Sequence, residues 1–169
     1  MTITLRVAKS AADYGAFGAL CRAYLAWSRR RYAELPWFVD EVFGHQSLDD
    51  ELKNLAVKYG PPGGLTLLAE LDGTIVAAGA YRTLSPGICE MKRLYVSDAA
   101  QGRGIGRQLA LALMAEAKTA GFTLMRLDTA SLLTEAIALY RSLGFEICPP
   151  YHDYPAKLMP HLVFMERPL

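Results

Sequence analysis

The sequence predicts a mixed α+β fold, in which a mostly antiparallel central sheet is flanked by helices. Three observations lead to this fold class. Three strand-like runs follow one another without a helix, a glycine-rich segment leads directly into a long apolar helix, and strands and helices alternate over the remainder. The chain has 169 residues, of which 52% are hydrophobic and 21% are charged, so we expect residues 1–169 to form one domain.

The first third of the chain predicts one strand and two helices. Residues 3–7 alternate between apolar and polar types, as in a half-buried strand. The segment Ser10-Ala11-Ala12-Asp13 has the pattern of a capping box, which would open a helix through Trp27. A second box at Ser47-Leu48-Asp49-Asp50 predicts another helix, which ends at Gly60-Pro61-Pro62.

Three strands are then predicted in succession. Residues 65–71 and 74–84 are joined by Asp72-Gly73, which is the strongest short hairpin signal. A turn at Ser85-Pro86-Gly87 leads into residues 88–96. Because tight turns reverse the chain, these three strands should pair antiparallel.

The remainder follows a glycine-rich loop. The predicted elements are a helix to about Ala120, a strand over 122–128, a helix over 134–143 that ends at Gly144, and strands over 145–148 and 162–167. The complete order is strand, two helices, three strands, helix, strand, helix and two strands.

The third of the consecutive strands has an apolar pattern that changes phase in its middle. Cys89 and Met91 follow one phase, whereas Leu94 and Val96 follow the other. A β-bulge would reconcile the two phases and would leave backbone groups free to bind an extended ligand. In the alternative, the strand is regular and Glu90 lies at a solvated end.

The glycine-rich loop carries the clearest functional signal. Gly102, Gly104 and Gly106 alternate directly before an apolar helix, where each glycine costs about 0.8 to 1 kcal/mol relative to alanine. They must therefore serve the backbone, whose N–H groups at a helix N-terminus favour an anion such as pyrophosphate. Arg103 and Arg107 add positive charge on either side.

Two other kinds of phosphate-binding loop fit less well. A P-loop needs Lys and then Ser or Thr after its last glycine, but Gly106 is followed by Arg107 and Gln108. A dinucleotide-binding fingerprint would place Arg107 at its third glycine, and residues 97–101 separate the loop from the strand. Asp128 lies near the position of a ribose-binding acid, which keeps a dinucleotide-binding domain open as an alternative.

The motifs together resemble the GCN5-related N-acetyltransferase (GNAT) superfamily. Gln101, Gly104 and Gly106 match its coenzyme A signature Q/RxxGxG/A in register. Residues 92–96 look like its bulged fourth strand, and residues 136–145 look like its AxxLYxxxGF segment. The resemblance covers the chain from about residue 65 onward. It implies the fold of that family, with acetyl-CoA bound as cosubstrate where strands four and five splay apart.

The resemblance also implies which residues bind the cosubstrate. Backbone amides of Leu94 and Val96 would hold the acetyl carbonyl and pantetheine, and the amides of 101–107 would hold the pyrophosphate. Such donors stabilise a tetrahedral oxyanion. The expected set is Leu94, Tyr95, Val96, Gln101, Gly102, Arg103, Gly104, Ile105, Gly106 and Arg107.

Two residues are the predicted catalytic groups. The resemblance places Tyr140 near the thioester sulfur, where its hydroxyl would protonate the leaving thiolate; core packing is the alternative. Glu90 is the expected general base, because an amine with a pKa of about 10.4 must lose a proton before it attacks. An exposed glutamate paired with a cross-strand lysine is the alternative for Glu90. His152 and Asp153 are rival bases.

The expected reaction is direct transfer of an acetyl group to a primary amine in a ternary complex. Cys89 has no histidine near it in the sequence, so an acetyl-cysteine intermediate is not expected. A non-catalytic acyl-CoA-binding sensor or partner module remains open as a different class of function.

The motifs do not identify the amine, which could be a small molecule or a peptide. Candidate wall residues for its pocket are Trp27, Tyr32, Trp37, Phe38, Tyr151 and Tyr154, and Arg29-Arg30-Arg31 is a candidate carboxylate site or a solvated surface.

Charge and cysteine content exclude several classes. The 18 Lys and Arg residues nearly balance 17 Asp and Glu residues, so we expect no binding to nucleic acid or to a membrane surface. The three cysteines match neither a zinc site nor a disulfide framework, which predicts no metal, reduced thiols and a cytoplasmic protein. The chain shows no secretory signal or spanning segment. The sequence leaves a homodimer open.

Overall fold

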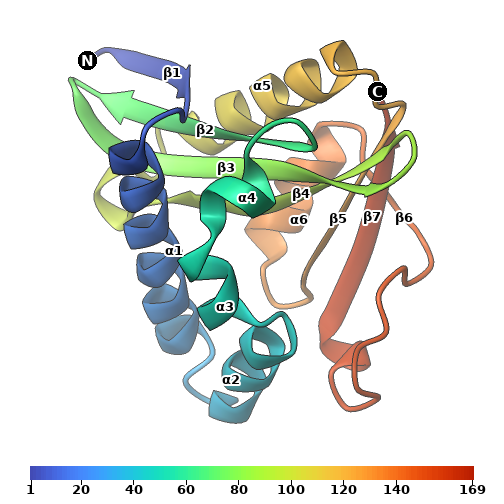
Figure 1. The fold of residues 1–169 in the computed structure, drawn as a ribbon. Helices are drawn as coiled ribbons and strands as arrows, with labels where there is room; N and C mark the ends of the chain where they lie inside the picture. The colour runs from blue at the N-terminus through green and yellow to red at the C-terminus, as the bar shows by residue number, and fades with distance from the viewer.

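The computed structural model describes all residues 1–169, and a single seven-stranded sheet forms its centre (Figure 1). Strands β1 (Ile3–Val7), β2 (Gly64–Leu71), β3 (Thr74–Ser85) and β4 (Ile88–Val96) pair antiparallel in succession. Strand β5 (Leu124–Ala130) is parallel to β4, and β7 (Leu162–Pro168) pairs antiparallel with both β5 and β6 (Glu146–Ile147). The mixed, mostly antiparallel sheet predicted from the sequence is confirmed.

Helices cover both faces of the sheet. Helices α1 (Ala11–Arg31) and α4 (Leu55–Tyr59) lie on one face, and α5 (Ile105–Thr119) and α6 (Thr134–Ser142) lie on the other (Figure 1). The alternation of strand side chains divides the core accordingly. Leu68 packs in a cluster with Phe17 of α1, whereas its neighbour Leu67 packs in a cluster with Leu109 of α5.

The first third of the chain confirms one predicted helix start and corrects the other. At Ser10 both bonds of the capping box are present, because its hydroxyl accepts from the N–H of Asp13 and the Asp13 carboxylate accepts from the N–H of Ser10. Ser47 makes no capping bond, since its φ of 54° holds the backbone in the left-handed region. The predicted second helix is instead α3 (Leu48–Lys53) and α4, divided at Asn54.

Helix α2 (Pro36–His45) was not predicted from the sequence. Its one start signal is Pro36 at the first helical position, where the fixed φ of proline suits a helix. Its buried side chains include Phe38, Val39 and Val42, which belong to an apolar cluster with Tyr154 and other residues near the end of the chain. Helix α2 therefore packs against segments that lie far away in the sequence.

The predicted β-bulge is present in β4. Ala78 pairs with Tyr95 and Ala80 pairs with Lys92, so two residues of β4 face one residue of β3. One of the two is Arg93, whose φ is 58°. The alternative of a regular strand with a solvated end is wrong, because Glu90 and Lys92 are both buried.

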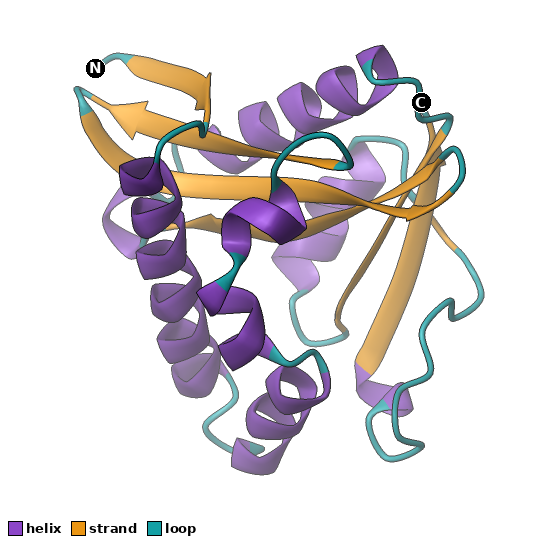
Figure 2. Cartoon of the chain, in the orientation of Figure 1, coloured by secondary structure: helices purple, strands orange, loops and turns teal.

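The sheet opens between β4 and β5, on the edge of β4 that does not pair with β3. Strands β4 and β5 pair at only three positions, from Ile88 with Leu124 to Glu90 with Arg126. In Figure 1, β5 and β7 then run steeply away from the flatter β2 to β4. The chain between β6 and β7 runs beside β7 mainly as a loop (Figure 2). No helix combines the length and the apolar character needed to cross a membrane.

Candidate active site

Two cavities meet where β4 and β5 separate. The glycine-loop cavity, about 390 Å³ in volume, is bounded by the end of β4, the glycine-rich loop and α6. The inner cavity, about 90 Å³ in volume, lies among α1, α2, β4 and β5. The residues that line both cavities are Tyr24, Leu94, Thr129, Leu133 and Tyr140. The two spaces are therefore neighbours with a common wall.

The glycine-loop cavity gathers nearly all of the residues expected to bind the cosubstrate. Its lining includes Leu94, Tyr95, Val96, Gln101, Gly102, Gly104, Ile105, Gly106 and Arg107. Arg103 is the exception, because its exposed side chain contacts the sulfur of Met1 instead. The role of these residues in binding stays a prediction, although the structure brings all but Arg103 to one cavity.

The backbone of the loop explains its glycines. Gly102 and Gly104 have φ angles of 75° and 76°, which a residue with a Cβ adopts only with strain. Gly104 is the N-cap of α5 and offers no side chain to the N–H groups of the first turn. Those donors remain available to an anionic ligand. Arg107 also faces this cavity and is held by a 2.8 Å hydrogen bond that it donates to Ser142 Oγ. The donors suit the pyrophosphate of coenzyme A.

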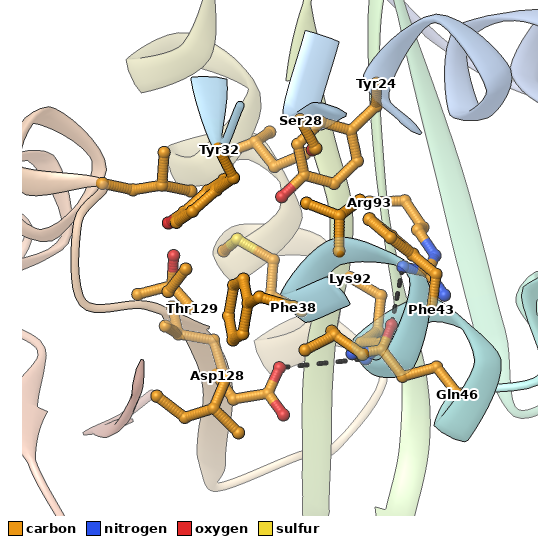
Figure 3. A pocket seen from close by; sticks show the side chains of 18 of the residues that line it. Tyr24, Ser28, Tyr32, Phe38, Phe43, Gln46, Lys92, Arg93, Asp128 and Thr129 are labelled. Atoms are coloured by element: carbon orange, nitrogen blue, oxygen red, sulfur yellow. Dashed lines mark hydrogen bonds and ion pairs between the residues drawn. The ribbon is translucent and has the colours of Figure 1, made fainter. Parts of the chain in front are cut away.

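The inner cavity is mostly apolar and contains one carboxylate. Thirteen of its nineteen lining residues are hydrophobic, and Asp128 is the only acidic one. Asp128 Oδ2 accepts a 2.8 Å hydrogen bond from the hydroxyl of Tyr154. Its Oδ1 lies 3.9 Å from Lys92 Nζ, as Figure 3 shows. From the sequence, Asp128 was expected only as a ribose-binding acid of the dinucleotide-binding alternative. No local pattern could have placed it here, because the divergence of β4 and β5 creates the cavity.

Two tyrosines stand in the common wall. Tyr140 is 9% exposed, and burial raises the pKa of its hydroxyl, with smaller contributions from Tyr24 and Asp128. Burial also raises the pKa of Tyr24, whose hydroxyl points into the inner cavity in Figure 3. Both hydroxyls are therefore protonated at neutral pH. Tyr140 was expected at this site, whereas Tyr24 was not singled out, because it reads as one more aromatic residue on a helix.

Glu90 lies in a buried network rather than in either cavity. Its carboxylate is fully buried and forms a 2.9 Å ion pair with Arg82. The hydroxyl of Tyr151 donates to it at 2.8 Å, and His152 Nε2 lies 2.6 Å from it. Burial opposes ionisation, but His152, Lys92 and Arg82 together hold the pKa of Glu90 well below its usual range. Its role as general base stays a prediction that these contacts do not favour.

The other residues singled out in the sequence are dispersed. Tyr32 and Phe38 line the inner cavity, and Trp27 lines the glycine-loop cavity. Trp37 is exposed and lines neither cavity. Asp153 is exposed as well. The three consecutive arginines form surface ion pairs, in which Arg29, Arg30 and Arg31 contact Asp40, Asp98 and Glu135. This fits the solvated-surface interpretation of that run.

Cys89 is fully buried, and burial raises the pKa of its thiol to about 12. A thiol that stays protonated at neutral pH is a poor nucleophile. All three cysteines are free and buried. These properties agree with the expectation that the reaction does not pass through an acetyl-cysteine.

One cluster has the geometry of a metal site. Ligand atoms of Glu90, Asp128 and His152 lie within 4.8 Å of one another. However, Arg82 is paired with Glu90 at 2.9 Å and Lys92 lies 3.9 Å from Asp128. These positive charges would repel a divalent cation. The absence of a metal stays a prediction.

Similar proteins identify the family. A model of the acetyltransferase (GNAT) family matches residues 25–145. An uncharacterized N-acetyltransferase of Schizosaccharomyces pombe is 39% identical over 122 residues, which cover 71% of this chain and 73% of that protein. An uncharacterized N-acetyltransferase of Escherichia coli is 37% identical over 106 residues, which cover 61% of this chain and 64% of that protein.

Solved structures agree in fold. An acetyltransferase from Streptococcus agalactiae superposes with a TM-score of 0.75 at 16% identity, covering 99% of this chain and 98% of that one. A PaiA N-acetyltransferase from Thermoplasma acidophilum, solved in complex with coenzyme A, gives a TM-score of 0.71 at 20% identity and covers 100% of both chains. At these identities the likeness extends to the fold alone. The family match and the 39% identical relative show that the chain belongs to the GNAT family of acetyl-CoA-dependent N-acetyltransferases, and the solved structures agree with its fold.

Proposed function

We propose that acetyl-CoA occupies the glycine-loop cavity and that a primary amine, from a small molecule or a peptide, enters the inner cavity. The observation that carries this proposal is the wall that both cavities share, which includes Tyr140 and the bulge residue Leu94. Two reactants held in adjoining cavities that the same residues line need only a small approach to react, and positioning alone can supply much of the rate enhancement. The amine then attacks the acetyl group directly.

Backbone donors are the proposed means of holding the cosubstrate. The bulge at Arg93 and Leu94 takes this part of β4 out of regular pairing with β3, and β5 does not pair with it. Amides in this stretch can bind the acetyl carbonyl and pantetheine, and the first turn of α5 can bind the pyrophosphate. The positive φ angles of Gly102 and Gly104 support this arrangement, because they direct the loop toward the helix N-terminus.

We assign the leaving-group proton to Tyr140 and the amine proton to Asp128. Tyr140 lines both cavities, and its hydroxyl is protonated at neutral pH and so carries a proton for the leaving thiolate. Asp128 is the acidic residue in the wall of the inner cavity, whereas Glu90 already contacts Arg82, Tyr151 and His152 and lies outside it. A general base must come within hydrogen-bonding reach of the proton that it removes. This requirement favours Asp128 over Glu90.

Two measurements on the purified protein test the function. Acetyl-CoA should raise the melting temperature and NAD should not, because a ligand of the native state stabilises it. Release of free thiol from acetyl-CoA should then depend on an added amine. Stabilisation by NAD alone would establish the dinucleotide-binding alternative. Tight binding of acetyl-CoA without turnover across a broad panel of amines would establish the acyl-CoA sensor.

A further inference from the structure

A third cavity adjoins the inner cavity and is lined almost entirely by polar residues. It has a volume of about 190 Å³, and only one of its ten lining residues is hydrophobic. We call it the polar cavity. Three side chains line both it and the inner cavity, namely Gln46, Lys92 and Arg93. These three side chains therefore form the partition between the proposed amine site and the polar cavity.

The partition contains donors that lack a full set of partners. Arg93 uses Nε to bind Glu51 at 2.7 Å and Nη1 to bind Gln46 Oε1 at 2.9 Å, but its Nη2 is buried without a partner. Lys92 has a side chain that is 7% exposed, and the carboxylate of Asp128, 3.9 Å away, is its one ion-pair partner. That distance is too long for a hydrogen bond. A buried donor without an acceptor is costly, so both cations suit an anionic ligand.

The surrounding charges do not supply that anion. Glu51 is shared, because it pairs with Lys58 at 2.8 Å as well as with Arg93. Glu90 is occupied by Arg82, Tyr151 and His152. Figure 3 shows Lys92, Arg93 and Gln46 gathered on one side of the inner cavity, away from the hydroxyl groups of Tyr32 and Thr129. Positive charge is therefore concentrated at one end of the cavity.

We propose that Gln46, Lys92 and Arg93 bind a carboxylate of the acceptor, so that the substrate is an amine that carries a carboxylate. The inference rests on the proposed function, because it takes the inner cavity as the amine site. Arginine and lysine donors form charge-assisted hydrogen bonds with a carboxylate, which are stronger than neutral ones. The same cations disfavour acceptors with several positive charges, such as polyamines, since like charges repel.

The size and lining of the inner cavity narrow the substrate further. A volume of about 90 Å³ accommodates roughly six water-sized groups, which is the scale of a single amino acid. The lining of the inner cavity also includes Phe38, Val39 and Leu162, which offer apolar contacts to a side chain. An α-amino acid with an apolar side chain fits these features.

The test uses acceptors in matched sets: leucine, methionine and phenylalanine, each with its carboxamide and its decarboxylated amine. We expect kcat/KM to be at least about 10²-fold higher for the carboxylates than for either analogue, because a site built for polar contacts rejects ligands that lack them. In the variant Lys92→Met the KM for the amino acid should rise at least 10-fold, while the affinity for acetyl-CoA stays unchanged. Lys53→Met is the matched control and should leave that KM unchanged, because Lys53 is an exposed lysine that lines neither the inner cavity nor the polar cavity.

The affinities of the reaction products test the carboxylate site independently of the proposed function. The N-acetyl amino acid should bind the CoA-loaded protein at least 10-fold more tightly than the corresponding N-acetyl amine, and Lys92→Met should abolish the difference. Equal kcat/KM for amino acids and decarboxylated amines would overturn the carboxylate site and leave amine acetylation standing. If no amine turns over but the product preference is present, the carboxylate site stands and the proposed reaction fails. Absence of any product preference, in wild type and variant alike, would overturn the carboxylate site.

Discussion

Arg93 and Glu51 form an ion pair of 2.7 Å in which the two side chains are only 4% and 1% exposed. Arg93 belongs to the bulge of β4 and Glu51 belongs to α3, so the pair connects the bulge to α3. Tyr59 strengthens the connection by donating a 2.7 Å hydrogen bond to Glu51. The backbone irregularity proposed to hold acetyl-CoA is thus supported by a buried charge pair.

Glu51→Gln should destabilise the protein by about 3 to 5 kcal/mol, because removing one member of a buried pair leaves the other charge uncompensated. Chemical denaturation of both proteins measures the difference. Asp50→Asn is the control, because Asp50 pairs with Lys53 on the surface, where both side chains are largely exposed. This change should stay within about 0.5 kcal/mol. A similar small loss for Glu51→Gln would contradict a supporting role for the pair.

The same pair should make stability depend on pH. Burial opposes the ionisation of Glu51, but Arg93, Lys58 and Tyr59 outweigh it and lower the pKa of Glu51 to about 2. A lowered folded-state pKa contributes stability above the unfolded-state pKa, and this contribution is lost as pH falls through the folded-state value. The stability difference between wild type and Glu51→Gln should therefore shrink between about pH 4.5 and pH 2. A difference that stays constant over that range would show that Glu51 has an ordinary pKa.

Tyr140→Phe should lower the turnover number about 10²-fold while the affinity for acetyl-CoA hardly changes, because only the proton donor is removed. We expect the lower end of the usual range, since a thiolate with a pKa of about 8.5 leaves with little help. Turnover, affinity and melting temperature should be measured on one preparation. Tyr24→Phe is the matched control from the same shared wall and should retain most of the turnover. Unchanged turnover in Tyr140→Phe, with chemistry rate-limiting, would remove this hydroxyl from the mechanism.

Asp128→Asn should lower kcat/KM about 10²-fold or more at neutral pH, because the amide keeps the shape but cannot take a proton. The deficit should narrow as the pH rises above the pKa of the acceptor, which then arrives as the neutral amine. Glu90→Gln should instead reduce stability, because it disturbs the ion pair with Arg82, and should leave turnover within about 10-fold of wild type. The reverse pattern, with the pH-dependent deficit in Glu90→Gln, would restore Glu90 as the base.

Gly104→Ala should weaken the binding of acetyl-CoA, because the φ of 76° at this N-cap strains a residue with a Cβ by about 1 to 3 kcal/mol. Relief of that strain would turn the first N–H groups of α5 away from the ligand. Gly106→Ala is the control, since its φ is ordinary and its nearest neighbour would lie 3.6 Å from the new Cβ. Calorimetric titration with coenzyme A compares the two variants. Equal affinities would show that the loop conformation does not govern binding.

The sequence alone determined the C-terminal two-thirds of the fold and the cosubstrate side of the candidate site. Residues 88–96 were predicted with the correct bounds for β4, and the phase change in its apolar pattern predicted the bulge. Likewise, the alternating glycines indicated a loop that serves a helix N-terminus. These features depend on neighbours in the chain, because strand period, turn chemistry and backbone freedom at glycine are local properties.

The tertiary structure alone decided the acceptor side of the site. β4 and β5 separate after three paired positions, and the space between them is the inner cavity, where Asp128 of β5 lies 3.9 Å from Lys92 of β4. No pattern within either strand encodes that separation. Glu90 has a suitable residue type for a base, yet His152, Tyr151 and Arg82 converge on it from other segments. Helix α2 lacks a side-chain cap, and it is held by packing against residues more than a hundred positions away. Burial and long-range charge pairing arise only when distant segments fold together, and they set the chemistry that the sequence could not specify.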